Sequence, residues 1–86
     1  MRIFKVLVVD DEPIILTSIK KILSSEKEFN VILVQSSRIA LERIKEEPFD
    51  IIITDLKMPG IDGMQLLENI KEIQPEVPVI MITAYS

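Results

Sequence analysis

Residues 5–10 read KVLVVD, and this stretch decides the fold class. A short, continuous apolar run rich in β-branched residues is typical of a parallel strand that is buried on both faces. A helix is predicted to follow at once, because Pro13 is tolerated in a first helical turn and apolar residues then recur at helical spacing through Lys27. These recurring residues are Ile15, Ile19 and Ile22. The chain therefore opens with the first half of a β-α-β unit.

The same alternation continues along the rest of the chain. Three further apolar runs predict strands at Val31–Val34, Phe49–Thr54 and Val77–Ile82. Two more helices lie between these strands, the first capped by Ser36 or Ser37 and the second opened by the capping-box pair Asp62 and Gln65. Their predicted apolar faces are Ala40, Leu41 and Ile44 in the first, and Met64, Leu67 and Ile70 in the second. This alternation predicts right-handed crossovers and a parallel sheet covered by helices on both faces.

The composition indicates one globular domain over residues 1–86. Of the 86 residues, 48% are hydrophobic and 28% are charged, which supplies one core and not two. The formal charge of −4 and the scattered basic residues argue against direct contact with nucleic acid. Cysteine and histidine are missing, which excludes disulfides, Cys/His zinc sites and Ser-His-Asp triads. With no secretory leader and no apolar run near the roughly 18 residues of a membrane span, the protein is expected in the cytoplasm and not in a membrane.

Three carboxylates follow predicted strands. Asp10 and Asp11 end the first strand, and Asp55 ends the third. If the strand order is 2-1-3-4, these two strands are neighbours at the point where the order reverses, which is where open α/β sheets bind ligands. Carboxylates about 4 Å apart repel each other by roughly 4 kcal/mol at an effective dielectric constant near 20. A hard divalent cation such as Mg²⁺ removes this repulsion and would let Asp55 act as a nucleophile toward a phosphoryl donor.

Each of these residues also has a simpler interpretation. Asp10 and Asp11 resemble a helix N-cap that complements the helix dipole, and Asp55 resembles a turn residue before the Met-Pro-Gly at 58–60. Thr83 ends the fourth predicted strand, where threonine is ordinary. The functional interpretation is favoured because all four residues end strands at the same edge of the predicted sheet.

Three motifs resemble those of the receiver domains of two-component response regulators. They are VVDDEP at residues 8–13, DLKMPGIDG at residues 55–63 and TA at residues 83–84. The resemblance implies a flavodoxin-like open parallel sheet in the order 2-1-3-4 and a phosphoprotein in which Asp55 accepts the phosphoryl group. It also implies a Mg²⁺ site in which Asp11 and Asp55 bind directly, Asp10 binds through water, and the backbone carbonyl of Lys57 completes the protein ligands.

The resemblance assigns further roles and a partner. Thr83 would hydrogen-bond a phosphoryl oxygen and shift on activation, whereas Gly60 and Gly63 are interpreted as backbone conformation. The resemblance implies that the phosphoryl donor is a phosphohistidine of a sensor histidine kinase. This chain contains no histidine and cannot supply that donor itself. Such kinases dock on the first helix of the family, here near Ile14, Ile15 and Ser18, although we assign most of these residues to the core. The sequences at residues 56–60 and 83–86 are similar to those of receivers attached to transcriptional activators, which implies transcription regulation.

The chain departs from the family pattern after residue 86. Receivers have five strands in the order 2-1-3-4-5, and the sequence lacks the last helix-strand-helix elements together with the lysine that contacts the phosphoryl group. A missing charge-assisted contact of this kind predicts weak phosphorylation and weak signalling by this chain alone. The fourth strand, 77–82, would also be a bare apolar edge, which predicts a homodimer or larger oligomer through that strand.

Two other functions stay open at this stage. One is an interaction module that oligomerises without phosphotransfer. The other is a phosphatase of the haloacid-dehalogenase type, in which a second aspartate follows the nucleophile by two positions. Here Glu12 follows Asp10 and Lys57 follows Asp55 at that distance, which argues against the phosphatase. We therefore expect a signalling domain and not an enzyme, apart from any catalysis of its own phosphorylation.

Overall fold

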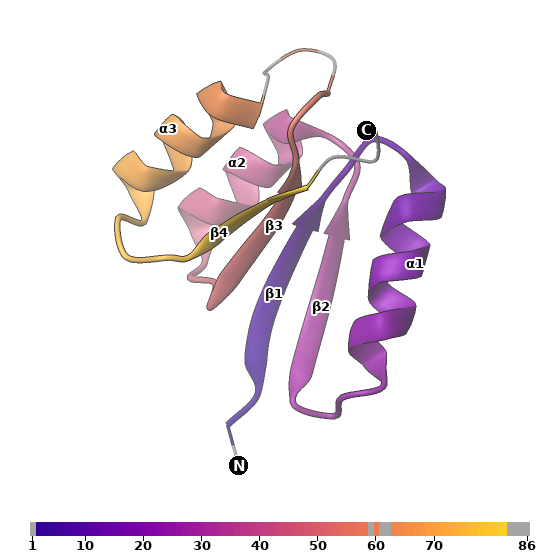
Figure 1. Ribbon diagram of the computed structural model, residues 1–86. Helices are drawn as coiled ribbons and strands as arrows, with labels where there is room; N and C mark the ends of the chain where they lie inside the picture. Colours follow the sequence, from indigo (N-terminus) through magenta and orange to yellow (C-terminus); the bar gives the residue numbers. More distant parts are fainter. Residues whose placement is uncertain (1, 59, 61–62, 83–86) are drawn as a thin grey trace.

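The computed structural model describes residues 2–58, 60 and 63–82. Strands and helices alternate along this part of the chain, as predicted (Figure 1). The elements are β1 (Phe4–Val9), α1 (Pro13–Ser24), β2 (Phe29–Val34), α2 (Ser37–Glu46), β3 (Ile51–Asp55), α3 (Gly63–Ile73) and β4 (Val79–Ile82). The strands form one parallel sheet in the order β2-β1-β3-β4, which confirms the predicted topology.

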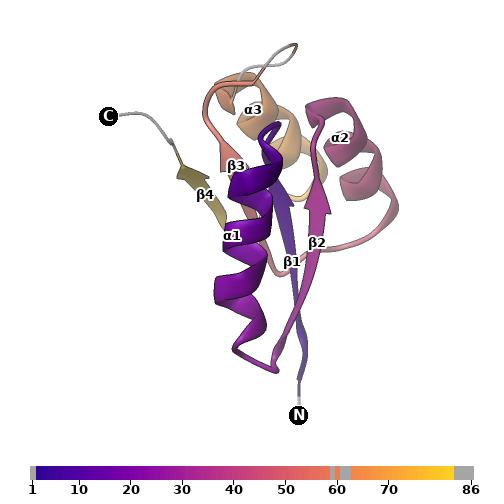
Figure 2. The same cartoon turned by 90° about the vertical axis from the view of Figure 1, so that its right-hand side faces the viewer.

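Helices lie on both faces of the sheet. Figure 2 shows α1 on one face, over β1 and β2, and α2 and α3 on the other. Successive residues of β1 point to opposite faces, so that Val6 and Val8 join Leu16 of α1 in a small core while Leu7 and Val9 join the larger core under α2 and α3. These four residues of β1 are at most 1% exposed, which explains why residues 6–9 form an uninterrupted apolar run.

The second helix follows the prediction closely. The Ser36 hydroxyl caps it by accepting a hydrogen bond of 3.3 Å from the Ile39 amide, and Ala40 and Ile44 of the predicted apolar face are buried. Leu41 packs against the same core from a partly buried position. The capping-box residue Asp62 of the third helix lies outside the described residues.

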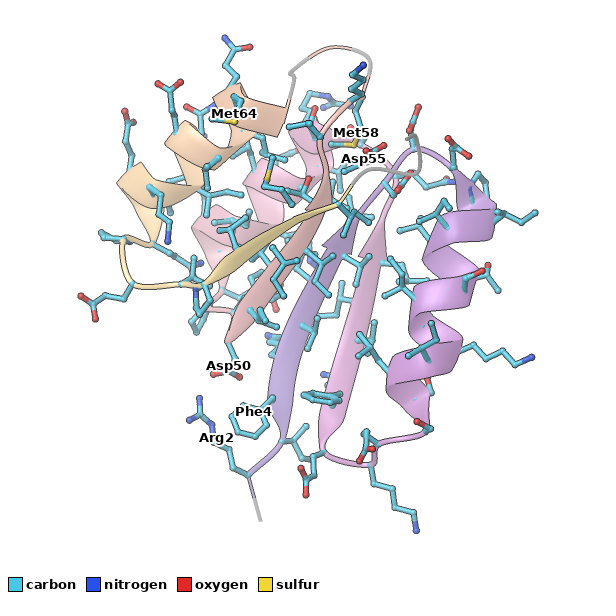
Figure 3. The ribbon with its side chains drawn as sticks, in the orientation of Figure 1. Arg2, Phe4, Asp50, Asp55, Met58 and Met64 are labelled. Carbon is cyan, nitrogen blue, oxygen red and sulfur yellow. The ribbon has the colours of Figure 1, made fainter. Side chains whose placement is uncertain are left out.

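The predicted apolar face of α3 is wrong at its first position. Met64 is 56% exposed (Figure 3). Leu66 and Ile70 are fully buried instead. The rotation of the helix follows from Gly63, which donates a backbone hydrogen bond of 2.9 Å to the Leu56 carbonyl. A Cβ atom at residue 63 would lie 2.7 Å from the backbone of Leu56, so only glycine allows this approach. Met64 and Leu66 are both apolar, and the sequence pattern alone fits either rotation.

The first helix is shorter than predicted and differs in its buried face. It ends at Ser24 and not at Lys27, because the chain turns there and the Glu26 amide bonds the Leu23 carbonyl at 3.0 Å. Leu16 is its buried residue. Of the predicted apolar residues, Ile19 packs against the same small core, whereas Ile22 is 69% exposed. The observed ends of the strands also differ from the predicted ends by one or two residues. No helix in the described ranges is long and apolar enough to cross a membrane.

Candidate functional site

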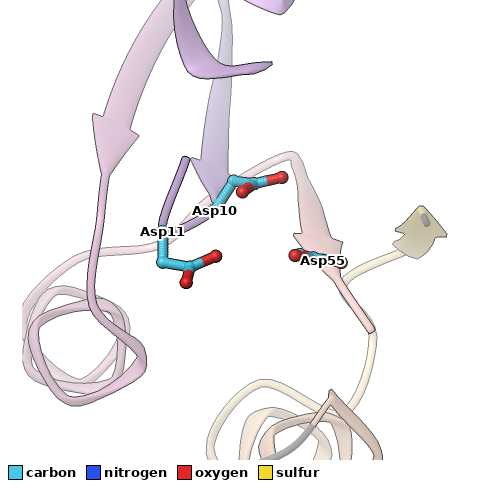
Figure 4. Close-up of side chains that lie close together, drawn as sticks. All are labelled: Asp10, Asp11 and Asp55. Carbon is cyan, nitrogen blue, oxygen red and sulfur yellow. The ribbon is translucent and has the colours of Figure 1, made fainter. Parts of the chain in front are cut away.

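The three predicted carboxylates converge at one end of the sheet. β1 and β3 are paired in parallel with Val9 opposite Thr54, so the residues that follow these positions emerge side by side. Asp10 and Asp11 come from the end of β1, and Asp55 is the last residue of β3 (Figure 4). Their carboxylate oxygens lie within 4.8 Å of one another. The convergence expected from the strand order is therefore confirmed.

Two of the carboxylates are buried and held by backbone amides. Asp10 is 1% exposed, and its Oδ1 accepts a hydrogen bond of 2.8 Å from the Glu12 amide. Asp55 is 7% exposed, and its Oδ1 accepts a bond of 3.2 Å from the Lys57 amide. Asp11 is exposed. The cluster therefore has two fixed groups at its base and one group on the solvent side.

The capping interpretation of the acidic pair does not fit this geometry. Glu12, and neither aspartate, is the N-cap residue of α1, and the helix has no side-chain cap hydrogen bond. Asp10 instead closes a local turn by bonding the amide two residues later, and Asp55 does the same with Lys57. The interpretation of Asp55 as a turn residue is therefore confirmed. The turns account for the hydrogen bond at one carboxylate oxygen of Asp10 and of Asp55, and they do not explain why the three carboxylates lie close together.

Burial makes the negative charge of the cluster costly. Desolvation raises the pKa of Asp10; the hydrogen bond from Glu12 opposes this, and the charges of Asp55 and Asp11 raise the pKa further. At 4.8 Å, two carboxylates repel by about 3 kcal/mol at an effective dielectric constant near 20. The donor set, three carboxylates with one open side, fits a hard divalent cation that keeps some of its water.

The loop after β3 is shaped by its glycines. Gly60 has φ +90°, a left-handed conformation that favours glycine, which confirms its interpretation as a backbone residue. Gly63 acts differently, through its close approach to Leu56. Met58, two residues before Gly60, is buried in the larger core. The Lys57 side chain is exposed. Thr83 lies outside the described residues.

Comparison with known proteins identifies the family of the chain. The family model of the response regulator receiver domain matches residues 6–86. Among curated proteins, the chain is 40% identical to the transcriptional regulatory protein ZraR of Escherichia coli K12, covering 94% of this chain and 18% of that protein. It is 33% identical to the fimbriae Z protein of Salmonella typhimurium LT2, covering 100% of this chain and 41% of that protein. The chain thus spans less than half the length of either relative.

Solved structures give the same result. A receiver domain protein from Clostridium thermocellum matches with a TM-score of 0.88 and 40% identity over 94% of this chain and 65% of that one. A CheY-like receiver domain protein from Methanospirillum hungatei matches with a TM-score of 0.91 and 33% identity over 98% of this chain and 66% of that one. The acidic cluster, the sheet order and these matches agree, and the chain belongs to the response regulator receiver domain family.

Proposed function

We propose that this chain is a phosphoacceptor, in which Asp55 takes a phosphoryl group in the presence of Mg²⁺. The observation that carries the proposal is the convergence of Asp10, Asp11 and Asp55 within 4.8 Å, with Asp55 at the tip of its strand. Three carboxylates held this close without a bound cation destabilise the fold, and a site for metal and phosphate accounts for the arrangement. Receiver domains are signalling domains, so a haloacid-dehalogenase phosphatase is not proposed.

The transfer uses Asp55 as the nucleophile. One carboxylate oxygen forms a bond to phosphorus while the bond from phosphorus to the donor breaks, and the leaving group keeps the electron pair and takes a proton from solvent. The Lys57 amide holds Oδ1 of Asp55, which fixes the direction of attack. A bound Mg²⁺ would neutralise the charge of the approaching phosphoryl group.

The remaining residues of the pocket support this step. Asp11 and Asp55 would bind the metal directly, and buried Asp10 would act through water while the Glu12 amide keeps its orientation. The backbone carbonyl of Lys57 would complete the protein ligands. We also assign Thr83 the contact with a phosphoryl oxygen that couples phosphorylation to a change in conformation.

The proposed physiological donor is a phosphohistidine of a sensor histidine kinase. The first turn of α1 follows directly from the acidic pair, and Ile14 in that turn is 74% exposed instead of buried in the core. An exposed apolar residue beside the pocket suits a docking surface, whereas Ile15 is partly buried. Because ZraR is named a transcriptional regulator, we propose that the output of this signalling is transcription, with the protein in the cytoplasm beside its kinase.

The test is mass spectrometry after incubation with acetyl phosphate and Mg²⁺. Wild type should gain the mass of one phosphoryl group, and the gain should disappear in Asp55→Asn and when EDTA removes the metal. Asp50→Asn, directly before the opposite end of β3, is the matched control and should still be phosphorylated. An adduct that survives Asp55→Asn, or no adduct on a folded wild type, would refute the proposal.

A further inference from the structure

Thr54, the residue before Asp55 in β3, carries a buried hydroxyl among apolar side chains. It is 0% exposed, and it is one of four polar side chains that are buried among the described residues. Side chains alternate along a strand, so Thr54 points to the same face as Ile52, which belongs to the larger core. A buried hydroxyl has lost its bonds to water and needs a partner within the protein. Valine has nearly the same shape without this requirement, so packing alone does not explain a threonine here.

The partner of this hydroxyl is the main chain of the proposed phosphoacceptor. Oγ1 of Thr54 donates a hydrogen bond of 3.3 Å to the Asp55 carbonyl. This length is long for a hydroxyl donor, so a small movement of the carbonyl is enough to strengthen or break the bond. The hydroxyl therefore acts on the backbone of Asp55 and not on its carboxylate.

The peptide that joins Asp55 to Leu56 is held from both sides. Its carbonyl accepts the bond from Thr54, and its N–H, which belongs to Leu56, donates to the Ile82 carbonyl at 2.9 Å. The next amide along the chain, that of Lys57, donates to Oδ1 of Asp55 at 3.2 Å. A peptide unit is planar, so a rotation of this one would also move the amide that follows it. The position of the Lys57 amide therefore depends on the contact made by the Thr54 hydroxyl.

We propose that Thr54 is a positioning residue for phosphoryl transfer to Asp55, a role that rests on the proposed function. Its hydroxyl fixes the peptide plane after Asp55, and this plane fixes the Lys57 amide that holds Oδ1. The other carboxylate oxygen of Asp55 then keeps its direction toward the acidic pocket, where it attacks phosphorus. Loss of the hydroxyl leaves the nucleophile in place but makes its orientation less well defined, which slows the transfer.

Rates of phosphorylation by acetyl phosphate with Mg²⁺ test this role. Thr54→Val keeps the shape of the side chain without its hydroxyl, and it should slow the transfer about three- to tenfold. Thr54→Ser keeps the hydroxyl and should recover most of the rate. Ile52→Val is the matched control, because it removes one methylene from the same strand and the same core, and it should react like wild type. Equal rates for Thr54→Val and wild type, or equal slowing in Ile52→Val, would overturn the proposal.

The stability of the same variants separates positioning from packing. In urea denaturation Thr54→Val should be at least as stable as wild type, because it places an apolar group in an apolar site. Thr54→Ser should be less stable, because it leaves a cavity the size of a methyl group. The order of the rates is expected to be the reverse of the order of the stabilities. If the rates instead follow the stabilities, Thr54 has only a packing role and the proposal is wrong.

Amide hydrogen exchange gives a test that does not require phosphoryl transfer. In metal-free protein, the Lys57 amide should exchange faster in Thr54→Val than in wild type or in Thr54→Ser, because its bond to Asp55 is less well held. A folded wild type that forms no adduct would refute the function of Asp55 and, with it, this role. An adduct on wild type, with the transfer rate and the Lys57 exchange both unchanged in Thr54→Val, would refute the role of Thr54 alone.

Discussion

Acidic side chains at the two ends of the parallel sheet have opposite surroundings, with basic partners at one end and further acidic groups at the other. At the amino end of the strands, Asp50 pairs with Arg2 and also accepts a hydrogen bond of 2.7 Å from the Lys5 amide (Figure 3). Glu47 nearby pairs with the Lys5 side chain and lies 3.1 Å from Nε of Arg43. Both of these acidic groups have basic partners.

At the carboxyl end, three acidic groups lie close together instead. Asp10, Asp11 and Asp55 are within 4.8 Å of one another, and the four ion pairs found among the described residues all involve other carboxylates. The amino end is arranged for stability, and the carboxyl end carries repulsion that a bound cation would relieve. A protein keeps such a cost where it serves a ligand, and this contrast supports the proposed site.

The largest effect on stability is expected from Gln74, which joins three segments at the amino end. Its Nε2 donates to the carbonyls of Ile44 at 2.8 Å and Glu47 at 2.9 Å, and its Oε1 accepts from the Phe49 amide at 3.2 Å. Gln74→Ala leaves these partly buried groups unpaired and should lower the free energy of unfolding by about 2–3 kcal/mol. Urea denaturation measures this. Exposed Gln35→Ala is the control, and a loss for Gln74→Ala no greater than the control's would show that water replaces these bonds.

The next effect compares one substitution at both ends. Asp10→Asn keeps an acceptor for the Glu12 amide and removes a buried charge, so it should raise the free energy of unfolding in metal-free buffer by about 1–2 kcal/mol. Asp50→Asn weakens the contact with Arg2 and should lower it by about 1 kcal/mol. Urea denaturation of both variants in buffer with EDTA gives the two values.

Added Mg²⁺ sharpens this comparison. It should stabilise wild type and Asp50→Asn, because the acidic cluster is intact in both, and it should stabilise Asp10→Asn much less. The comparison fails if Asp10→Asn and Asp50→Asn change the free energy of unfolding in the same direction. It also fails if Mg²⁺ stabilises all three proteins equally.

The acidic cluster was predictable because it depends on strand ends. Buried strands are visible as apolar runs, and in a parallel sheet the residue after each run emerges at the same edge. Asp10 and Asp55 could therefore be placed together although they are 45 positions apart in the sequence. The turn at Asp55 was also predicted from the local sequence, whereas the turn at Asp10 was not, because the acidic pair was interpreted as a helix cap.

Other features depend on contacts that leave no local pattern. Gln74 bonds residues 25 to 30 positions away, and nothing in its neighbourhood of the sequence marks it. The face of α3 was predicted from apolar spacing, which both Met64 and Leu66 satisfy, and the choice is made by the close approach of Gly63 to Leu56. Tertiary packing determines both of these features, and the periodicity of apolar residues in the sequence carries no information about it.

The smallest effect concerns pH at the amino end. The hydrogen bond from Lys5, together with the charge of Arg43, lowers the pKa of Glu47 below its ordinary value of 4.5. A carboxylate with a lowered pKa in the folded state adds stability that is fully present above pH 4.5 and is lost as pH falls through the folded-state value. Glu47→Gln should therefore be less stable than wild type at neutral pH and should approach it in acid. Melting temperatures between neutral and acidic pH test this, with exposed Glu46→Gln as control, and a constant difference across that range would show that the Lys5 contact does not stabilise the fold.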